Sequence, residues 1–201
     1  MYEVLEIPAL PPRSIVLTPP LTDVEFERMC AQASLGFLER SKEGTITVNA
    51  PAGGMTSDAN AEITRQLRNW WLFHRIGRTF DSNAGFFLPD GSMLSPDAAY
   101  ATAAQLQGLT RADLVRFPRF APAFIIELRS ESDRLAEVQA KMETWIANGA
   151  ELAWLIDPDA KQVHVYAQGN APRVESGSTV AGSGPVDGFV LDLQEVWRCY
   201  E

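Results

Sequence analysis

Residues 122–134, PAFIIELRSESDR, join an apolar run to full charges of opposite sign, and this combination limits the folds open to the chain. The run FIIEL is typical of a strand that is buried on both faces. Side chains alternate along a strand, so Glu127 and Arg129 share one face. Because a buried ion without a partner is costly, these charges require partners, a metal ion or water. They form either a structural ion pair or part of a functional site.

The segments before this strand alternate between helical and strand patterns. Residues 1–20 are rich in proline and are expected to be extended. LTDVEFERMCAQ (21–32) predicts a short helix with Thr22 or Asp23 as N-cap. GTITVNAP (44–51) mixes β-branched and polar residues and predicts a strand.

A longer helix is predicted over ANAEITRQLRNWWLFHRIG (59–77), with Ser57 or Asp58 as N-cap and Gly77 as its end. Its apolar residues fall on one face, as they do in a helix that packs on a core. That face consists of Ile63, Leu67, Trp70 and Trp71. For the two tryptophans we favour core packing or a homodimer contact over stacking on nucleic-acid bases.

The second half of the chain continues the alternation. The turn signal PDGS (89–92) predicts a hairpin, and residues 103–121 predict a helix or an irregular connection before the strand AFIIELR. A helix is expected over 132–148, capped by Ser132 or Asp133, and two strands over 151–169. The tail predicts a loop and a last strand or helix. With no repeat and no linker, we expect one α/β domain over residues 1–201.

Composition limits the classes of function. No apolar run approaches the roughly 18 residues of a membrane span, and the N-terminus lacks the pattern of a secretory signal. Cys30 and Cys199 lie far apart, which favours a reduced, cytoplasmic protein. The net charge is −9, yet residues 62–141 hold ten bases against nine acids. This near-neutral, Arg-rich middle is compatible with either an anion-binding surface or an ordinary solvated one.

Several common sites have no counterpart in the sequence. His74 and His164 are the only histidines, and neither lies in an HExxH motif or near a cysteine pair, which argues against a zinc site. The chain has no GxSxG elbow and no Walker loop, and GSGPVDG (182–188) lacks the lysine that cradles phosphate. A hydrolase based on a serine nucleophile or a nucleotide-binding loop is therefore not expected.

Asp97 offers a second carboxylate for the charged end of the central strand. In LSPDAAYA it follows a proline and leads into small residues that suit a strand beside AFIIELR. Two carboxylates and a backbone carbonyl on adjacent strands can bind Mg²⁺, which prefers oxygen ligands and retains water and phosphate. Such a site polarises a phosphate ester and lowers the pKa of bound water.

The ordered set Pro96-Asp97 followed by Glu127-Leu128-Arg129 resembles the PD-(D/E)xK pattern of restriction-endonuclease-like nucleases. The chain is more closely similar to the Uma2 family within that superfamily. The matching stretches occur in the family's order between about residues 57 and 166. They are NAEITRQL, GFFLPDGSMLSPDAAY, FPRFAPAFIIELRSESD, KMETWIANGAELAWLIDP and VHVY.

The resemblance implies a mixed central sheet flanked by helices, with a nuclease core at about residues 44–168 on which both terminal extensions pack. It implies cleavage of phosphodiester bonds with a divalent metal, Mg²⁺ or Mn²⁺ in its place. Asp97 and Glu127 match the metal-binding carboxylates, and the Leu128 carbonyl is a further expected ligand. Glu62 matches an accessory acid in the preceding helix, although a solvated acid is an equal alternative.

Position 129 departs from the pattern, because the superfamily has lysine where this chain has arginine. Arginine stays charged and cannot accept a proton from water, but it can hold phosphate or stabilise negative charge. Lys141 is an alternative source of the lysine. It lies at the edge of the apolar face of helix 132–148 and can lean toward the strand or extend into solvent as a surface lysine.

Two hypotheses on function follow. In the first, the protein is a metal-dependent DNA endonuclease with Asp97, Glu127, Arg129, Lys141 and Glu62 in its site. In the second, the arginine marks lost catalysis, and the fold binds nucleic acid or a protein partner. Because the chain is acidic, we expect that it holds DNA either with a basic partner or as a homodimer that pools its Arg-rich surfaces, and we favour the homodimer.

Overall fold

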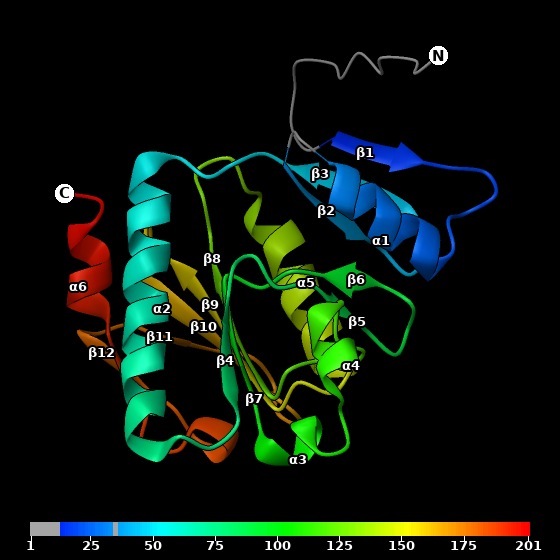
Figure 1. The fold of residues 1–201 in the computed structure, drawn as a ribbon. Helices are drawn as coiled ribbons and strands as arrows, with labels where there is room; N and C mark the ends of the chain where they lie inside the picture. The colour runs from blue at the N-terminus through cyan, green and yellow to red at the C-terminus, as the bar shows by residue number, and fades with distance from the viewer. Residues whose placement is uncertain (1–12, 34–35) are drawn as a thin grey trace.

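The computed structural model describes residues 13–33 and 36–201, and its centre is a mixed sheet of six strands (Figure 1). The strands lie in the order β11-β10-β9-β8-β7-β4. β8 and β9 are parallel, and the other neighbours are antiparallel. The predicted mixed sheet is therefore confirmed. Its strands are β4 (Arg78–Asp81), β7 (Ala98–Ala101), β8 (Phe124–Leu128), β9 (Leu152–Asp157), β10 (Gln162–Ala167) and β11 (Arg173–Glu175).

β8 is the buried strand that the sequence predicts, and all five of its residues are buried. It lies between β7 and β9, so the segment after Asp97 is adjacent to it as expected. The chain leaves β8, forms helix α5 (Leu135–Ala147) and returns as β9. This crossover is the connection that two parallel neighbours require.

A second sheet is antiparallel, with strand order β1-β3-β2-β6-β5. The sequence predicts three of its strands, β3 and the hairpin of β5 and β6, but neither β1 nor β2. Each of the two missed strands has only four residues, too few for a clear alternation. The strands are β1 (Arg13–Val16), β2 (Phe37–Arg40), β3 (Thr45–Asn49), β5 (Phe86–Phe87) and β6 (Met93–Leu94). Of the proline-rich residues 1–20, those before residue 13 lie outside the described part.

Helices α2 (Gly54–His74) and α5 cover opposite faces of the six-stranded sheet (Figure 1). The core on the α2 face also contains helix α6 (Leu193–Arg198), near the C-terminus. Both tryptophans of α2 pack at the edge of this core, which agrees with the interpretation as core residues. No helix within residues 13–33 and 36–201 combines the length and the apolarity of a membrane span.

Two predicted helix starts are wrong, each for a local reason. α2 begins at Gly54 instead of after Ser57 or Asp58, because the Ser57 N–H already bonds to the Gly53 carbonyl at 2.9 Å. α5 begins at Leu135 instead of residue 132. The Asp133 carboxylate accepts the Ser130 N–H and hydroxyl, each at 2.8 Å, and so closes the preceding turn instead of capping the helix.

The remaining elements connect or cover these layers. α1 (Asp23–Gln32) starts at the predicted N-cap Thr22 with a capping box. The connection before β8 contains two short helices, and the tail forms a two-stranded sheet, a turn of 3-10 helix and α6. These segments are α3 (Ala103–Leu106), α4 (Arg111–Val115), β12 (Thr179–Ala181), η1 (Gly184–Val186) and β13 (Val190–Asp192).

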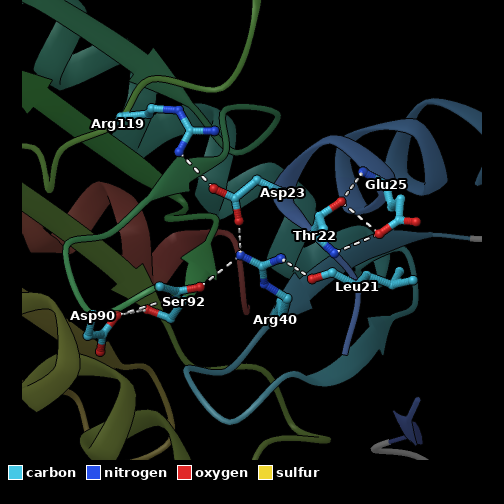
Figure 2. A network of polar contacts seen from close by, with 9 residues as sticks. Leu21, Thr22, Asp23, Glu25, Arg40, Asp90, Ser92 and Arg119 are labelled. Atoms are coloured by element: carbon cyan, nitrogen blue, oxygen red, sulfur yellow. Dashed lines mark hydrogen bonds and ion pairs between the residues drawn. The ribbon is translucent and has the colours of Figure 1, made fainter. Parts of the chain in front are cut away.

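The buried guanidinium of Arg40 connects the second sheet to the elements around it. Arg40, at the end of β2, is 5% exposed and donates to the Leu21 carbonyl at 3.1 Å and the Gly91 carbonyl at 2.9 Å. It also pairs with Asp23, which Arg119 contacts from the other side at 2.7 Å (Figure 2). One side chain thus joins β2, the start of α1 and the β5–β6 turn.

Replacing Arg40 with leucine is expected to lower the free energy of unfolding by about 3 kcal/mol, because three acceptors, on Leu21, Asp23 and Gly91, lose the charged donor of a buried side chain. Arg119→Leu is the matched control. It removes a pair to the same Asp23 from a side chain that is 59% exposed, so its cost should stay below about 1 kcal/mol. Urea denaturation of both variants measures the difference. Equal losses would mean that burial does not distinguish the two arginines.

Candidate active site

Asp97 lies just before β7 and is held at both carboxylate oxygens. Its Oδ2 accepts the backbone N–H of Leu128, the last residue of β8, at 2.7 Å. Its Oδ1 accepts the side-chain amide of Asn60, on α2, at 2.9 Å. Burial raises the pKa of Asp97, while the bond from Leu128 opposes that rise. The carboxylate is therefore fixed in orientation at the point where β7, β8 and α2 meet.

Glu127, on β8, is 5% exposed and points toward α5. Its Oε1 accepts the indole N–H of Trp145 at 2.9 Å, and its Oε2 accepts the ammonium of Lys141 at 3.0 Å. Burial raises the pKa of Glu127 to about 8, and the charges of Asp97 and Glu39 add to the effect, whereas Lys141 opposes it. The acid is thus buried and paired, and it binds a proton more tightly than a free glutamate does.

Lys141, on α5, leans toward the sheet, as one of the two sequence interpretations expects. Its Nζ contacts three acceptors, which are the Ser95 carbonyl at 2.8 Å, Glu39 at 2.9 Å and Glu127 at 3.0 Å. Burial disfavours the ammonium, but the two carboxylates outweigh this and raise the pKa of Lys141 above its usual value. The lysine therefore stays charged, and all three of its donors are used.

Glu39 is a third carboxylate of this cluster, which sequence reasoning missed. It comes from β2 of the second sheet, outside the residues 44–168 assigned to the nuclease core. Its Oε1 accepts the Ser95 N–H at 2.8 Å and also contacts Lys141, and its Oε2 accepts the Asn49 amide at 3.0 Å. FLER is too short to predict as a strand, so no local signal pointed to this residue.

Arg129 shares a strand with Glu127 but makes no hydrogen bond or ion pair with Glu127 or Asp97. Its guanidinium pairs with Asp157 at 3.1 Å and with Asp159 at 3.3 Å. Asp157 ends β9, and the parallel register of β8 and β9 carries it next to Arg129. Leu128 reaches Asp97 through its N–H, while the expected role of its carbonyl as a metal ligand remains a prediction.

Glu62 is also placed apart from the acid cluster. It accepts two bonds from Arg65, at 2.7 and 2.5 Å, and one from Gln66 at 2.8 Å. These bonds hold the pKa of Glu62 below its usual value. The residue lines a surface groove between α2 and α6, with Arg198 and Cys199 on the far side. From the same helix, Asn60 reaches Asp97 instead.

The donor set suits a hard divalent cation. Glu127 and Asp97 offer carboxylate oxygens, the ligands that Mg²⁺ prefers, and together with Glu39 the carboxylates outnumber the single ammonium of Lys141. The Asn60 side-chain oxygen is buried and has no hydrogen-bond partner within the described residues. In the part of the chain that the structure describes, no three His, Cys, Asp or Glu side chains are already arranged around a metal position. The chemistry of the site therefore fits a metal, with rearrangement of the carboxylates.

Comparisons with known proteins identify a shared fold and a family. A crystal structure described as "a putative nuclease belonging to DUF820", from Anabaena variabilis, superposes with a TM-score of 0.74. The match covers 90% of this chain and 100% of that chain at 19% sequence identity, which establishes a shared fold. No curated protein matches the sequence.

The family comparison spans the candidate site. The family model of Uma2, described as "Putative restriction endonuclease", matches residues 23–194. That range includes all three carboxylates, Lys141, the six-stranded sheet and every strand of the five-stranded sheet except β1. The resemblance seen in the sequence is confirmed, and the chain belongs to the Uma2 family.

Proposed function

We propose that the protein is a metal-dependent endonuclease that hydrolyses phosphodiester bonds in DNA. The observation that carries the proposal is the placement of Asp97 and Glu127 at adjacent ends of the neighbouring strands β7 and β8, with Lys141 bonded to Glu127. The family description and the fold shared with a nuclease support the same activity. Hydrolysis adds water across one P–O ester bond. The water oxygen joins phosphorus, one proton goes to the leaving oxygen, and the other is released to solvent.

Asp97 and Glu127 would hold the metal, which we propose to be Mg²⁺ with Mn²⁺ as a substitute, and the Leu128 carbonyl is a further proposed ligand. The bound ion supplies a Lewis acid and a water of lowered pKa. The chain's own contribution is orientation, because Asn60 and the Leu128 N–H fix the Asp97 carboxylate before anything binds. Fixed ligands reduce the reorganisation that binding requires.

Lys141 supplies the positive charge for the phosphate in this proposal. Its ammonium already lies 3.0 Å from Glu127, and its raised pKa keeps it charged. A fixed ammonium stabilises the negative charge that grows on phosphate oxygens during the reaction. Arg129 is assigned a structural role, in which it joins the ends of β8 and β9 through Asp157. The catalytic roles predicted for Arg129 and Glu62 are untested, and neither contacts the acid cluster.

DNA is the proposed substrate, and a chain with a net charge of −9 needs a local basic surface to bind its phosphates. The homodimer expected from the sequence remains a prediction, for which the end of α2 offers an apolar surface. Phe73 is 89% exposed there and Ile76, just beyond the helix, is 58% exposed. A dimer through this end would bring two copies of Arg75 and Arg78 near one another.

A second candidate function, a binding module without catalysis, has one observation in its favour. All four oxygens of Asp97 and Glu127 already accept hydrogen bonds from protein donors. The two functions differ in metal binding. Isothermal titration with Mn²⁺ should show a site that weakens in Asp97→Asn if the protein is a nuclease. A protein that binds DNA but takes up no Mn²⁺ would be the module.

The decisive experiment is a cleavage assay on plasmid and single-stranded DNA. We expect cleavage only when Mg²⁺ or Mn²⁺ is present, and complete inhibition by excess EDTA. An Asp97→Asn preparation, purified in the same way, is the control for contaminating nuclease. Equal cleavage by both preparations would refute the assignment of the site.

A further inference from the structure

Lys141 is shared between two carboxylates that belong to different sheets. Glu127 lies on the six-stranded sheet, 3.0 Å from the ammonium, and Glu39 lies on the five-stranded sheet, 2.9 Å from it. The Ser95 carbonyl, on the segment that links the two sheets, is the third acceptor at 2.8 Å. Loss of the Glu127 contact would therefore leave the lysine with two of its three partners.

Glu39 is held in place independently of the lysine. The Ser95 N–H and the Asn49 amide bond to its two oxygens, and only 12% of its side chain is exposed. The next residue, Arg40, is fixed by the contacts that join β2 to α1 and the β5–β6 turn (Figure 2). Glu39 thus presents a carboxylate to Lys141 that does not need the lysine to keep its position.

A metal ion and the Lys141 ammonium compete for the same acid. Each Glu127 oxygen already accepts a donor, so an entering cation must displace or weaken the bond from Lys141. If Lys141 had no other anion nearby, releasing Glu127 would leave a partly buried ammonium without a counter-charge. A charge without a partner is unfavourable in a partly buried position, and metal binding would have to overcome that penalty.

We propose that Glu39 is a positioning residue that retains Lys141 when Glu127 turns its oxygens toward a divalent ion. The inference rests on the proposed metal site. Glu39 acts through the lysine and is not itself a ligand. It lowers the cost of freeing Glu127, and it keeps the ammonium beside the site, where the phosphate needs it.

The test is a double-mutant cycle read by Mn²⁺ affinity, measured at one pH by isothermal titration of the full chain. Glu39→Gln keeps the shape and removes the charge, and we expect it to weaken Mn²⁺ binding about tenfold. In a Lys141→Met background the same change should weaken binding less than about twofold, because no lysine remains to be retained. Glu43→Gln, which removes an equal charge from the exposed turn after β2, should have no measurable effect.

Three outcomes would overturn the inference. They are an unchanged affinity in Glu39→Gln, an equal tenfold loss with and without Lys141, and a loss of similar size in Glu43→Gln. The second would make Glu39 a ligand in its own right, and the third would make it one charge among many. If Lys141→Met does not fold, Lys141→Gln takes its place in the cycle. Failure of the wild type to bind Mn²⁺ is a different result, because it removes the proposed function itself.

Discussion

Glu127→Gln is expected to reduce metal-dependent cleavage by about 10³-fold or more and to change how stability depends on pH. The amide keeps an acceptor for the Trp145 indole N–H, so the local packing is retained. It removes a negative charge that a divalent ion needs as a ligand. The loss of cleavage should therefore come with weaker Mn²⁺ binding and a folded protein.

The sign of the pH effect follows from the direction of the pKa shift. Glu127 has a pKa of about 8 in the folded protein against 4.5 when unperturbed, so the folded state binds the proton more tightly. Stability therefore falls as pH rises from about 4.5 to 8, and the loss is complete above that range. Asp97, whose pKa burial also raises, gives a slope of the same sign in both proteins.

Urea denaturation in EDTA at pH 5.5 and pH 9 measures this difference. The wild type should lose about 3 kcal/mol more than Glu127→Gln between the two pH values, because roughly 2.5 pH units of this interval lie below the folded pKa at about 1.4 kcal/mol each. Equal losses would show that Glu127 does not titrate in this range. Cleavage by the variant at a rate close to that of the wild type would remove Glu127 from the metal site.

Lys141→Met is expected to slow cleavage by about 10²- to 10³-fold, because the phosphate loses a fixed positive charge. Methionine fills the volume of the lysine stem, so the α5 packing should survive. Mn²⁺ binding should persist in this variant, since a cation that competes for Glu127 has been removed. Single-turnover cleavage at saturating metal measures the effect.

Arg129→Lys is the matched comparison for the second basic position. It keeps a charge beside Asp157, and we expect its cleavage rate to lie within about threefold of the wild type. Arg129→Gln, assayed at a temperature where the protein is shown to be folded, should retain more than about a tenth of the rate. A loss in Arg129→Gln as large as that in Lys141→Met would restore the catalytic role predicted from the sequence.

Local patterns were sufficient for the elements on which the site is built. The apolar run of β8, the turn signal before β6 and the small residues of β7 each predict their strand, and adjacent strands bring Asp97 and Glu127 together. Helix periodicity also places Lys141 at the edge of the buried face of α5. These predictions depend on residues close in sequence, where alternation and turn chemistry are informative.

The failures concern partners that are distant in the chain. Arg129 shares a strand face with Glu127, but only the parallel register with β9 shows that Asp157 lies beside it. Glu39 enters the site from a second sheet, built partly from four-residue strands, which the segment between β6 and β7 connects to the first. Glu62 lies only two residues after Asn60 on α2. Two residues are about 200° apart around a helix axis, so Asn60 contacts Asp97 while Glu62 faces the groove beside α6.

The position of the lysine has a consequence for finding such enzymes in genomes. A linear search that demands lysine two places after the glutamate would reject this chain and score it as inactive. The Lys141 ammonium nevertheless lies 3.0 Å from the Glu127 carboxylate, although Lys141 is on α5, 14 positions after Glu127. Under the proposed assignment of Lys141, the spatial arrangement and not the spacing defines the site, and arginine at the strand position is then not by itself evidence of a decayed enzyme.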